Sequence, residues 1–195
     1  MNRRVRRRRR FALGGVAVLV GLVVGVLVAG GAFDKAIKEL TLPLRHEDII
    51  RQQAREKGVD ASLIAAVIYS ESKFVDQTSH AGARGLMQIT PDAAEFIERQ
   101  SGGTSFELKD LANPEINIRY GTFLLAELLE RYDGDEAAAL AAYNAGPGNA
   151  DEWGGADLTV EDIEFPETRA YVEEVLEKRR EYRDKYGKEL GYGGG

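Results

Sequence analysis

The chain has 195 residues, with 26 Lys and Arg against 32 Asp and Glu and a formal net charge of −6 at pH 7. It contains no Cys and only two His, which excludes a disulfide framework, a thiolate site and a His-rich metal centre. Seven of the arginines precede Phe11, so the rest of the chain is strongly acidic, and we expect no metal, no cofactor and no attraction to an anionic surface.

The N-terminal segment combines an arginine cluster with a long apolar stretch. Residues 11–33 are 23 residues without a charge, and as a helix they would extend about 35 Å, enough to cross a bilayer. The positive-inside rule keeps residues 1–10 in the cytoplasm and places the chain after residue 33 outside it. We therefore predict a transmembrane anchor at 11–33. Because this anchor follows the arginines directly, they do not indicate a nucleic-acid partner.

Two details of the anchor leave alternatives open. The small residues at 29–32 would suit a cleavable signal peptide, although the apolar regions of such signals are usually shorter. Gly21 and Gly25 form a small-xxx-small pair that would allow weak self-association of the anchor, but glycine is common in such helices.

After a short linker at 34–45, apolar spacing and helix-end signals predict a mostly helical region. The expected helices are 46–57, 60–71, 91–100, 114–132, 136–144 and 168–186. Roughly 140 residues can bury one core, so we expect a single domain over 46–187, followed by a flexible tail at 188–195. The Gly-, Asp- and Glu-rich stretch 146–164 predicts a flexible loop, in which Trp153 either stacks on a ligand or anchors the loop.

Glu71 ends one of these helices and shares its apolar face. It follows Val67 and Ile68 at the four- and three-residue steps that define a helix face. A carboxyl among apolar side chains, near a helix C-terminus, stays protonated near neutral pH, as a general acid must. Lys73 would oppose this if its ammonium turned toward the carboxyl. The alternative is an ordinary Glu at a helix end that points into solvent.

A loop with two glycines follows Glu71 by about ten residues. Gly82 and Gly85 would let the backbone approach a ligand closely or take a positive φ. Gln88 offers a donor and an acceptor suited to sugar hydroxyl and acetamide groups. The alternative is a plain connection between helices in which Met87 fills the core.

Four strings, in order, resemble the catalytic domain of soluble-type lytic transglycosylases, which are relatives of goose-type lysozyme. They are Glu71-Ser72-Lys73-Phe74, Gly82-Ala83-Arg84-Gly85-Leu86-Met87-Gln88-Ile89, Ala142-Tyr143-Asn144-Ala145-Gly146-Pro147-Gly148 and Phe165-Pro166-Glu167-Thr168-Arg169-Ala170-Tyr171-Val172. The resemblance covers roughly residues 47–186. One departure is Val75-Asp76-Gln77-Thr78, which lacks the Pro and the extra residue that many relatives carry, so the shape of this loop stays open.

The resemblance implies a mostly α, lysozyme-like domain. Together with the anchor predicted from the N-terminal residues, we expect this domain behind one transmembrane helix, in a bacterial cell membrane and outside the cytoplasm. It implies that Glu71 is the catalytic acid and base. The residues that it implies for substrate binding are Gln88 and Asn144 as hydrogen-bonding groups, Met87 and Tyr143 as groove lining, and Tyr171 beside the acid. From the residues alone, the two tyrosines could equally be core aromatics, and Asn144 could simply end a helix.

The motifs offer no clear second carboxylate, since Asp76 lies in a loop and Glu167 at a helix start. One acid suffices if the muramic 6-hydroxyl is the nucleophile. We therefore expect a peptidoglycan lytic transglycosylase that acts on glycan strands and leaves 1,6-anhydro ends. A hydrolytic muramidase and an inactive, membrane-tethered peptidoglycan-binding protein are the alternatives.

Overall fold

The computed structural model describes residue 37, residues 39–101 and residues 107–193, and it divides the chain into two units, Met1–Pro43 and Leu44–Gly195. The anchor predicted at 11–33 lies outside the described residues. Of the helices that are described, none is both long and apolar enough to cross a membrane. In the first unit, the Thr41 hydroxyl donates to the carbonyl of Ile37, as in a helical turn.

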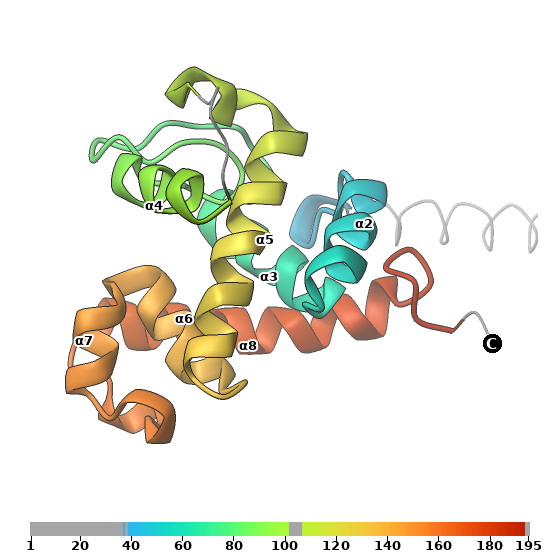
Figure 1. Cartoon of the computed structure of the whole chain (residues 1–195). Helices are drawn as coiled ribbons and strands as arrows, with labels where there is room; N and C mark the ends of the chain where they lie inside the picture. Colours follow the sequence, from blue (N-terminus) through green and yellow to red (C-terminus); the bar gives the residue numbers. More distant parts are fainter. Residues whose placement is uncertain (1–36, 38, 102–106, 194–195) are drawn as a thin grey trace, which may run out of the picture. The chain divides into compact units, whose positions relative to one another are not determined.

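The second unit is mostly helical, as predicted (Figure 1). Its helices are α2 (Glu47–Lys57), α3 (Ala61–Ser72), α4 (Pro91–Ser101), α5 (Pro114–Arg131), α6 (Glu136–Ala145), α7 (Pro147–Glu152) and α8 (Pro166–Tyr186), with short 3-10 helices η1 (Leu108–Ala112), η2 (Gly155–Asp157) and η3 (Val160–Asp162). Extended pairing in the described part is limited to two isolated bridges, Thr78 with Arg84 and Arg84 with Ile89.

Helix α3 is the core helix of this unit. Its first eight residues, Ala61 to Ile68, are all buried, because the segment carries no charge on any face. Its most extensive packing is against α8, while α5 crosses the unit between α4 and the α6–α8 side (Figure 1). The core helix therefore carries Glu71 in its last turn, after a fully buried segment.

Local chemistry sets the ends of α3. The Asp60 side chain accepts from the backbone N–H groups of Ser62 and Leu63, which caps the N-terminus. At the other end, Lys73 and Phe74 both take positive φ, of 53° and 63°. A bulky residue rarely adopts that conformation, and burial of Phe74, only 2% exposed, stabilises it here.

Two segments expected to be flexible make defined contacts in the structure. Residues 147–162 form α7, η2 and η3, and Trp153 is 8% exposed with its ring 4.9 Å from that of Phe165, so it anchors the segment. In the tail, Leu190 is 3% exposed and the Tyr192 hydroxyl donates to Asp60 at 2.6 Å, so residues 188–193 are docked on the domain. The sequence left anchoring by Trp153 open as one of two alternatives, whereas the contact of Tyr192 with Asp60 joins residues 132 positions apart, which no local pattern encodes.

Candidate functional site

Glu71 lies in the last turn of α3 with a partly exposed side chain. Burial raises the pKa of its carboxyl from an ordinary 4.5 to about 7, and the interaction with the Tyr171 hydroxyl opposes that shift only in part. No other carboxylate of the described residues acts on this pKa. A proton is therefore held on Glu71 near neutral pH by desolvation alone.

Two tyrosines approach Glu71 from other helices. Burial raises the pKa of Tyr171 on α8 and of Tyr143 on α6, and the charge of Glu71 raises both further. The Tyr143 hydroxyl donates to the carbonyl of Met87 at 2.9 Å. The buried Tyr171 hydroxyl makes no hydrogen bond of normal geometry with a described residue, although it lies close enough to lower the pKa of Glu71. The structure thus brings together one predicted acid and two predicted tyrosines from α3, α6 and α8.

Lys73 turns away from the acid. Its ammonium lies 2.8 Å from a carboxylate oxygen of Glu174 and 3.8 Å from the centroid of the Tyr69 ring. The ion pair holds the cation toward α8 and the ring contact holds it against Tyr69 of α3, and Lys73 is not among the groups that shift the pKa of Glu71. The sequence could not decide between these two directions for Lys73.

The loop after α3 folds back over the end of the helix. The Ser72 hydroxyl donates to the carbonyl of Leu86 at 2.7 Å. The Gln77 amide donates to the carbonyl of Glu71 at 3.1 Å, and the Gln77 carbonyl accepts from Gly85 N–H at 2.9 Å. Gln77 belongs to the string that departs from the family pattern, and here it ties the loop to the residue that carries the acid.

Asn117, a buried residue of α5 that sequence reasoning did not single out, holds this loop from the inside. Its Oδ1 accepts from Met87 N–H at 2.8 Å, and its Nδ2 donates to the carbonyls of Arg84 and Leu111 at 2.9 and 3.0 Å. A Cβ on Gly85 would lie 2.1 Å from Asn117 Nδ2, so only glycine fits there. The available signal was an amide between two isoleucines, Ile116 and Ile118.

The loop residues Gln88 and Met87 contribute different groups to the site, a side-chain amide and a backbone carbonyl. Gln88 Nε2 donates to the carbonyls of Gln77 and Gly85, which leaves Oε1 for a ligand. Met87 is 0% exposed, so its side chain does not line the groove in this structure. It fills the space above Gly121, where an added Cβ would lie 2.4 Å from the Met87 sulfur. Its contribution to the site is the backbone carbonyl that fixes Tyr143.

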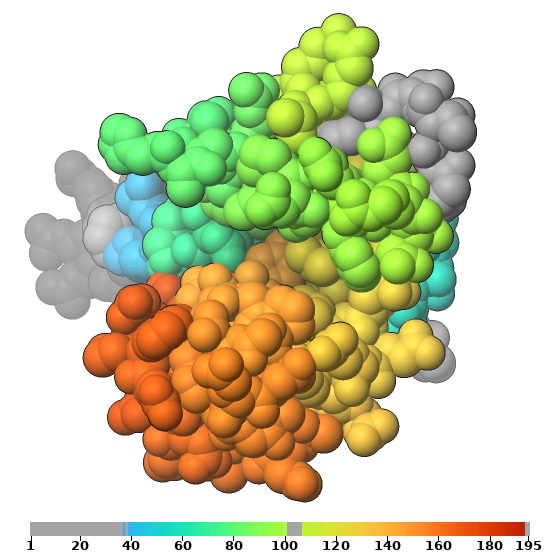
Figure 2. All heavy atoms as spheres, turned by 60° about the vertical axis from the view of Figure 1, so that its left-hand side comes forward, coloured from blue at the N-terminus to red at the C-terminus, as the bar shows by residue number. Residues whose placement is uncertain are grey.

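A groove of about 690 Å³ has Tyr143 in its wall, although Glu71 itself is not part of the lining. Figure 2 shows the hollow between the green segment that contains α4 and the orange segment that contains α7. Its lining includes Thr90, Asp92, Ala93, Phe96, Leu124, Glu127, Leu128, Arg131 and residues 142–147. Tyr143 belongs both to this wall and to the surroundings of Glu71, so it joins the two. Asn144 also lines the groove, and its Oδ1 accepts from the Thr168 hydroxyl of α8 at 2.8 Å.

Comparison with known proteins gives one consistent result. The Transglycosylase SLT domain matches residues 48–165. A soluble lytic murein transglycosylase of Salmonella typhimurium is 34% identical over 176 residues, which cover 83% of this chain and 26% of the relative. The chain therefore spans about a quarter of that relative's length.

Solved structures agree. The 70 kDa soluble lytic transglycosylase of Escherichia coli superposes with a TM-score of 0.72 at 31% identity, over 88% of this chain and 29% of that one. An inactive Glu-to-Gln mutant of the lytic transglycosylase Slt from Pseudomonas aeruginosa gives 0.72 at 33% identity, over 77% and 26% of the two chains. The prediction of a mostly helical, lysozyme-like domain is confirmed.

Proposed function

The chain belongs to the Transglycosylase SLT domain family, and on that premise we propose that it is a peptidoglycan lytic transglycosylase. It cleaves the β-1,4 bond between N-acetylmuramic acid and N-acetylglucosamine without water and leaves a 1,6-anhydro end. The observation that carries this proposal is the Glu71 carboxyl between Tyr143 and Tyr171, whose pKa burial raises to about 7 with no other carboxylate of the described residues contributing to the shift. Glycosidases that use water or a protein nucleophile need such a second carboxylate within about 5 to 10 Å.

The reaction proceeds in two proton transfers through one group. Protonated Glu71 donates its proton to the glycosidic oxygen, and the bond from that oxygen to the muramic anomeric carbon breaks. The resulting carboxylate then takes the proton of the muramic 6-hydroxyl, whose oxygen forms the new bond to the same carbon. Glu71 ends protonated, ready for the next cycle, and the intramolecular attack needs no positioned water.

The neighbouring groups support these steps. The Tyr171 hydroxyl is buried without a strong partner, so it is available to donate to the Glu71 carboxylate once the acid has lost its proton. Tyr143 is fixed by Met87 and forms the wall that passes from the acid to the groove. Gln88 Oε1 and the amide of Asn144 are the polar groups that we assign to the glycan.

Residues 11–33 anchor the chain in this proposal, with residues 1–10 in the cytoplasm and the domain on the side where peptidoglycan lies. The support is the uncharged 23-residue stretch behind an arginine cluster. Weak self-association through Gly21 and Gly25 belongs to the same proposal. Fractionation of cells that express the full chain tests the anchor: recovery in the soluble fraction, with the chain shortened at its N-terminus, would indicate a cleaved signal instead.

Digestion of purified peptidoglycan, followed by mass spectrometry, tests the chemistry. The expected products are one water lighter than those of a lysozyme. Glu71→Gln should abolish them, whereas Glu167→Gln, which removes an exposed carboxyl at the start of α8, should not. Products with the additional water would identify a hydrolytic muramidase. Binding of peptidoglycan by the wild type with no cleavage products would identify a binding protein.

A further inference from the structure

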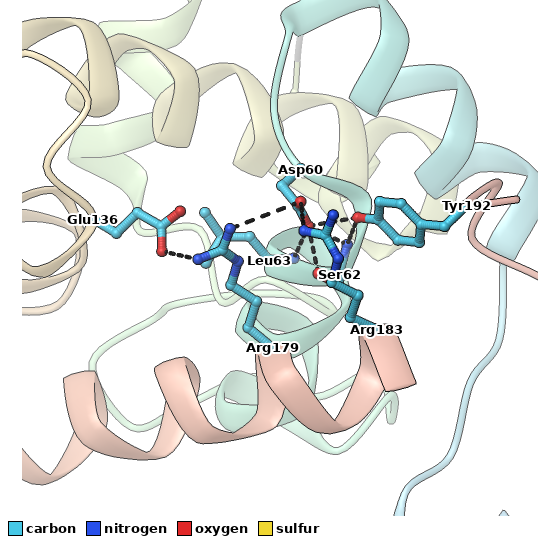
Figure 3. A network of polar contacts seen from close by, with 7 residues as sticks. All are labelled: Asp60, Ser62, Leu63, Glu136, Arg179, Arg183 and Tyr192. Carbon is cyan, nitrogen blue, oxygen red and sulfur yellow. Dashed lines mark hydrogen bonds and ion pairs between the residues drawn. The ribbon is translucent and has the colours of Figure 1, made fainter. Parts of the chain in front are cut away.

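One arginine of α8 connects three helices. Figure 3 shows Arg179 between Glu136 at the start of α6 and Asp60, the N-cap of α3. Its guanidinium lies 2.5 Å from a Glu136 oxygen and 3.8 Å from an Asp60 oxygen. Arg183, one turn further along α8, lies 3.3 Å from an Asp60 oxygen, and its guanidinium also lies 4.7 Å from the centroid of the Tyr192 ring.

Each helix that meets at Arg179 also carries one group of the site. Glu71 lies eleven residues after Asp60 on α3, and Tyr143 lies seven residues after Glu136 on α6. Tyr171 lies eight residues before Arg179 on α8. At 1.5 Å per residue, these separations are about 16, 10 and 12 Å. The three helices are therefore joined at one end by Arg179 and meet around the acid at the other.

The Arg179 connection is partly shielded from water. The side chains of Arg179, Asp60 and Glu136 are 28%, 22% and 25% exposed. Burial raises the pKa of Asp60, but hydrogen bonds from Ser62 and the Tyr192 hydroxyl, together with the charge of Arg179, outweigh burial and leave the pKa below its ordinary value. Asp60 is thus ionised and held in one orientation, and partly desolvated charge pairs interact more strongly than exposed ones.

We propose that Arg179 is a positioning residue, which fixes the mutual placement of α3, α6 and α8 and thereby keeps Glu71 desolvated between Tyr143 and Tyr171. The inference rests on the proposed function, since it concerns the same acid. Arg179 makes no direct contribution to the pKa of Glu71. A change of that pKa on removal of Arg179 would therefore report a movement of the helices.

Arg183 is the matched control. It is a cation of the same helix and pairs with the same Asp60 carboxylate, but it does not reach α6 and its side chain is 54% exposed. Arg179→Met removes the charge and keeps most of the side-chain length. Arg183→Met makes the same change one turn further along α8. Arg179→Lys offers a single ammonium, which cannot span both carboxylates as a guanidinium does. Arg179→Lys should therefore change the pKa of Glu71 and kcat in the same direction as Arg179→Met, but by less.

The experiment measures the pKa of Glu71 directly, by carbon-13 NMR titration of glutamate side-chain carboxyls in the full-length chain, with the Glu71 signal assigned by its loss in Glu71→Gln. We expect Arg179→Met to lower this pKa by about 0.5 to 1 unit, because water reaches the acid. Arg183→Met should change it by less than about 0.3 unit. In peptidoglycan digestion, kcat of Arg179→Met should fall about tenfold with KM nearly unchanged.

Each outcome separates this inference from the proposed function. If the pKa of Glu71 is raised in the wild type and stays equally raised in Arg179→Met, and only the melting temperature falls, the role of Arg179 is purely structural. That result overturns the inference and leaves the proposed function intact. An ordinary wild-type pKa would overturn the account of the acid in the proposed function. If Arg179→Met does not fold, Glu136→Gln removes the α6 partner and leaves the pair with Asp60. It should lower the pKa in the same direction, and no change there would also overturn the inference.

Discussion

Replacement of Glu71 by Gln should make the folded protein more stable at alkaline pH. A buried acid whose folded pKa lies above its unfolded pKa favours folding while it is protonated and opposes folding once it must ionise. For Glu71, the two pKa values are about 7 in the folded state and 4.5 in the unfolded state. Its contribution to stability is therefore greatest below pH 4.5 and is lost as the pH rises to 7. Gln keeps the volume but never ionises.

The size of the effect follows from the two pKa values. One pKa unit corresponds to about 1.4 kcal/mol, so the full difference is about 3 kcal/mol. By proton linkage, ionisation of Glu71 lowers the unfolding free energy of the wild type by about 1 kcal/mol at pH 5 and by about 3 kcal/mol at pH 8. The difference in unfolding free energy between Glu71→Gln and the wild type should thus rise by about 2 to 3 kcal/mol between these pH values. For a chain of this length, that is about 5 to 10 °C in melting temperature.

Thermal unfolding of the full-length chain, followed by circular dichroism from pH 4 to pH 9, measures this difference. Comparing the variant with the wild type at each pH cancels the other titrating groups. The substitution also alters the contact with Tyr171, which adds a pH-independent difference in unfolding free energy. That difference does not affect the test, which is the change with pH of the difference between the variant and the wild type. Glu167→Gln, at an exposed position, should differ from the wild type by less than about 0.5 kcal/mol throughout. A flat difference for Glu71→Gln would mean that the carboxyl is hydrated and would refute the argument for a buried acid.

Three further predictions concern the acid and its loop. In peptidoglycan digestion, kcat should fall as the pH rises through about 7, because only protonated Glu71 donates a proton; a rate that keeps rising to pH 9 would contradict this. Glu174→Gln releases the Lys73 ammonium, which should lower the pKa of Glu71 and move that fall to lower pH, and the further change Lys73→Met should reverse it. Gly85→Ala places a Cβ in contact with a buried amide at a positive φ, so urea unfolding should show a loss of about 2 to 4 kcal/mol. Gly134→Ala, also at positive φ but with open space around it, should lose only about 1 kcal/mol, and equal losses would count against the steric argument.

Sequence reasoning succeeded where the rules are local. Helix periods, caps and stops act over three or four residues, so the main helices and the Asp60 cap could be predicted from their own segments. The same rules placed Glu71 at the end of a helix on its apolar face. The order of the motifs then identified the family, because it depends on residue identities along the chain and not on how distant segments pack.

Only the tertiary structure decided what surrounds the acid. Tyr143 and Tyr171 reach Glu71 from helices that begin 65 and 95 residues further along the chain, and no local period encodes such contacts. Lys73 had two directions open to it, and its ion pair with Glu174 of α8 selects one. The buried amide of Asn117 and the docked tail likewise depend on partners distant in sequence. Desolvation raises the pKa of Glu71, and desolvation is a property of the packed helices together, so it exists only once they have assembled.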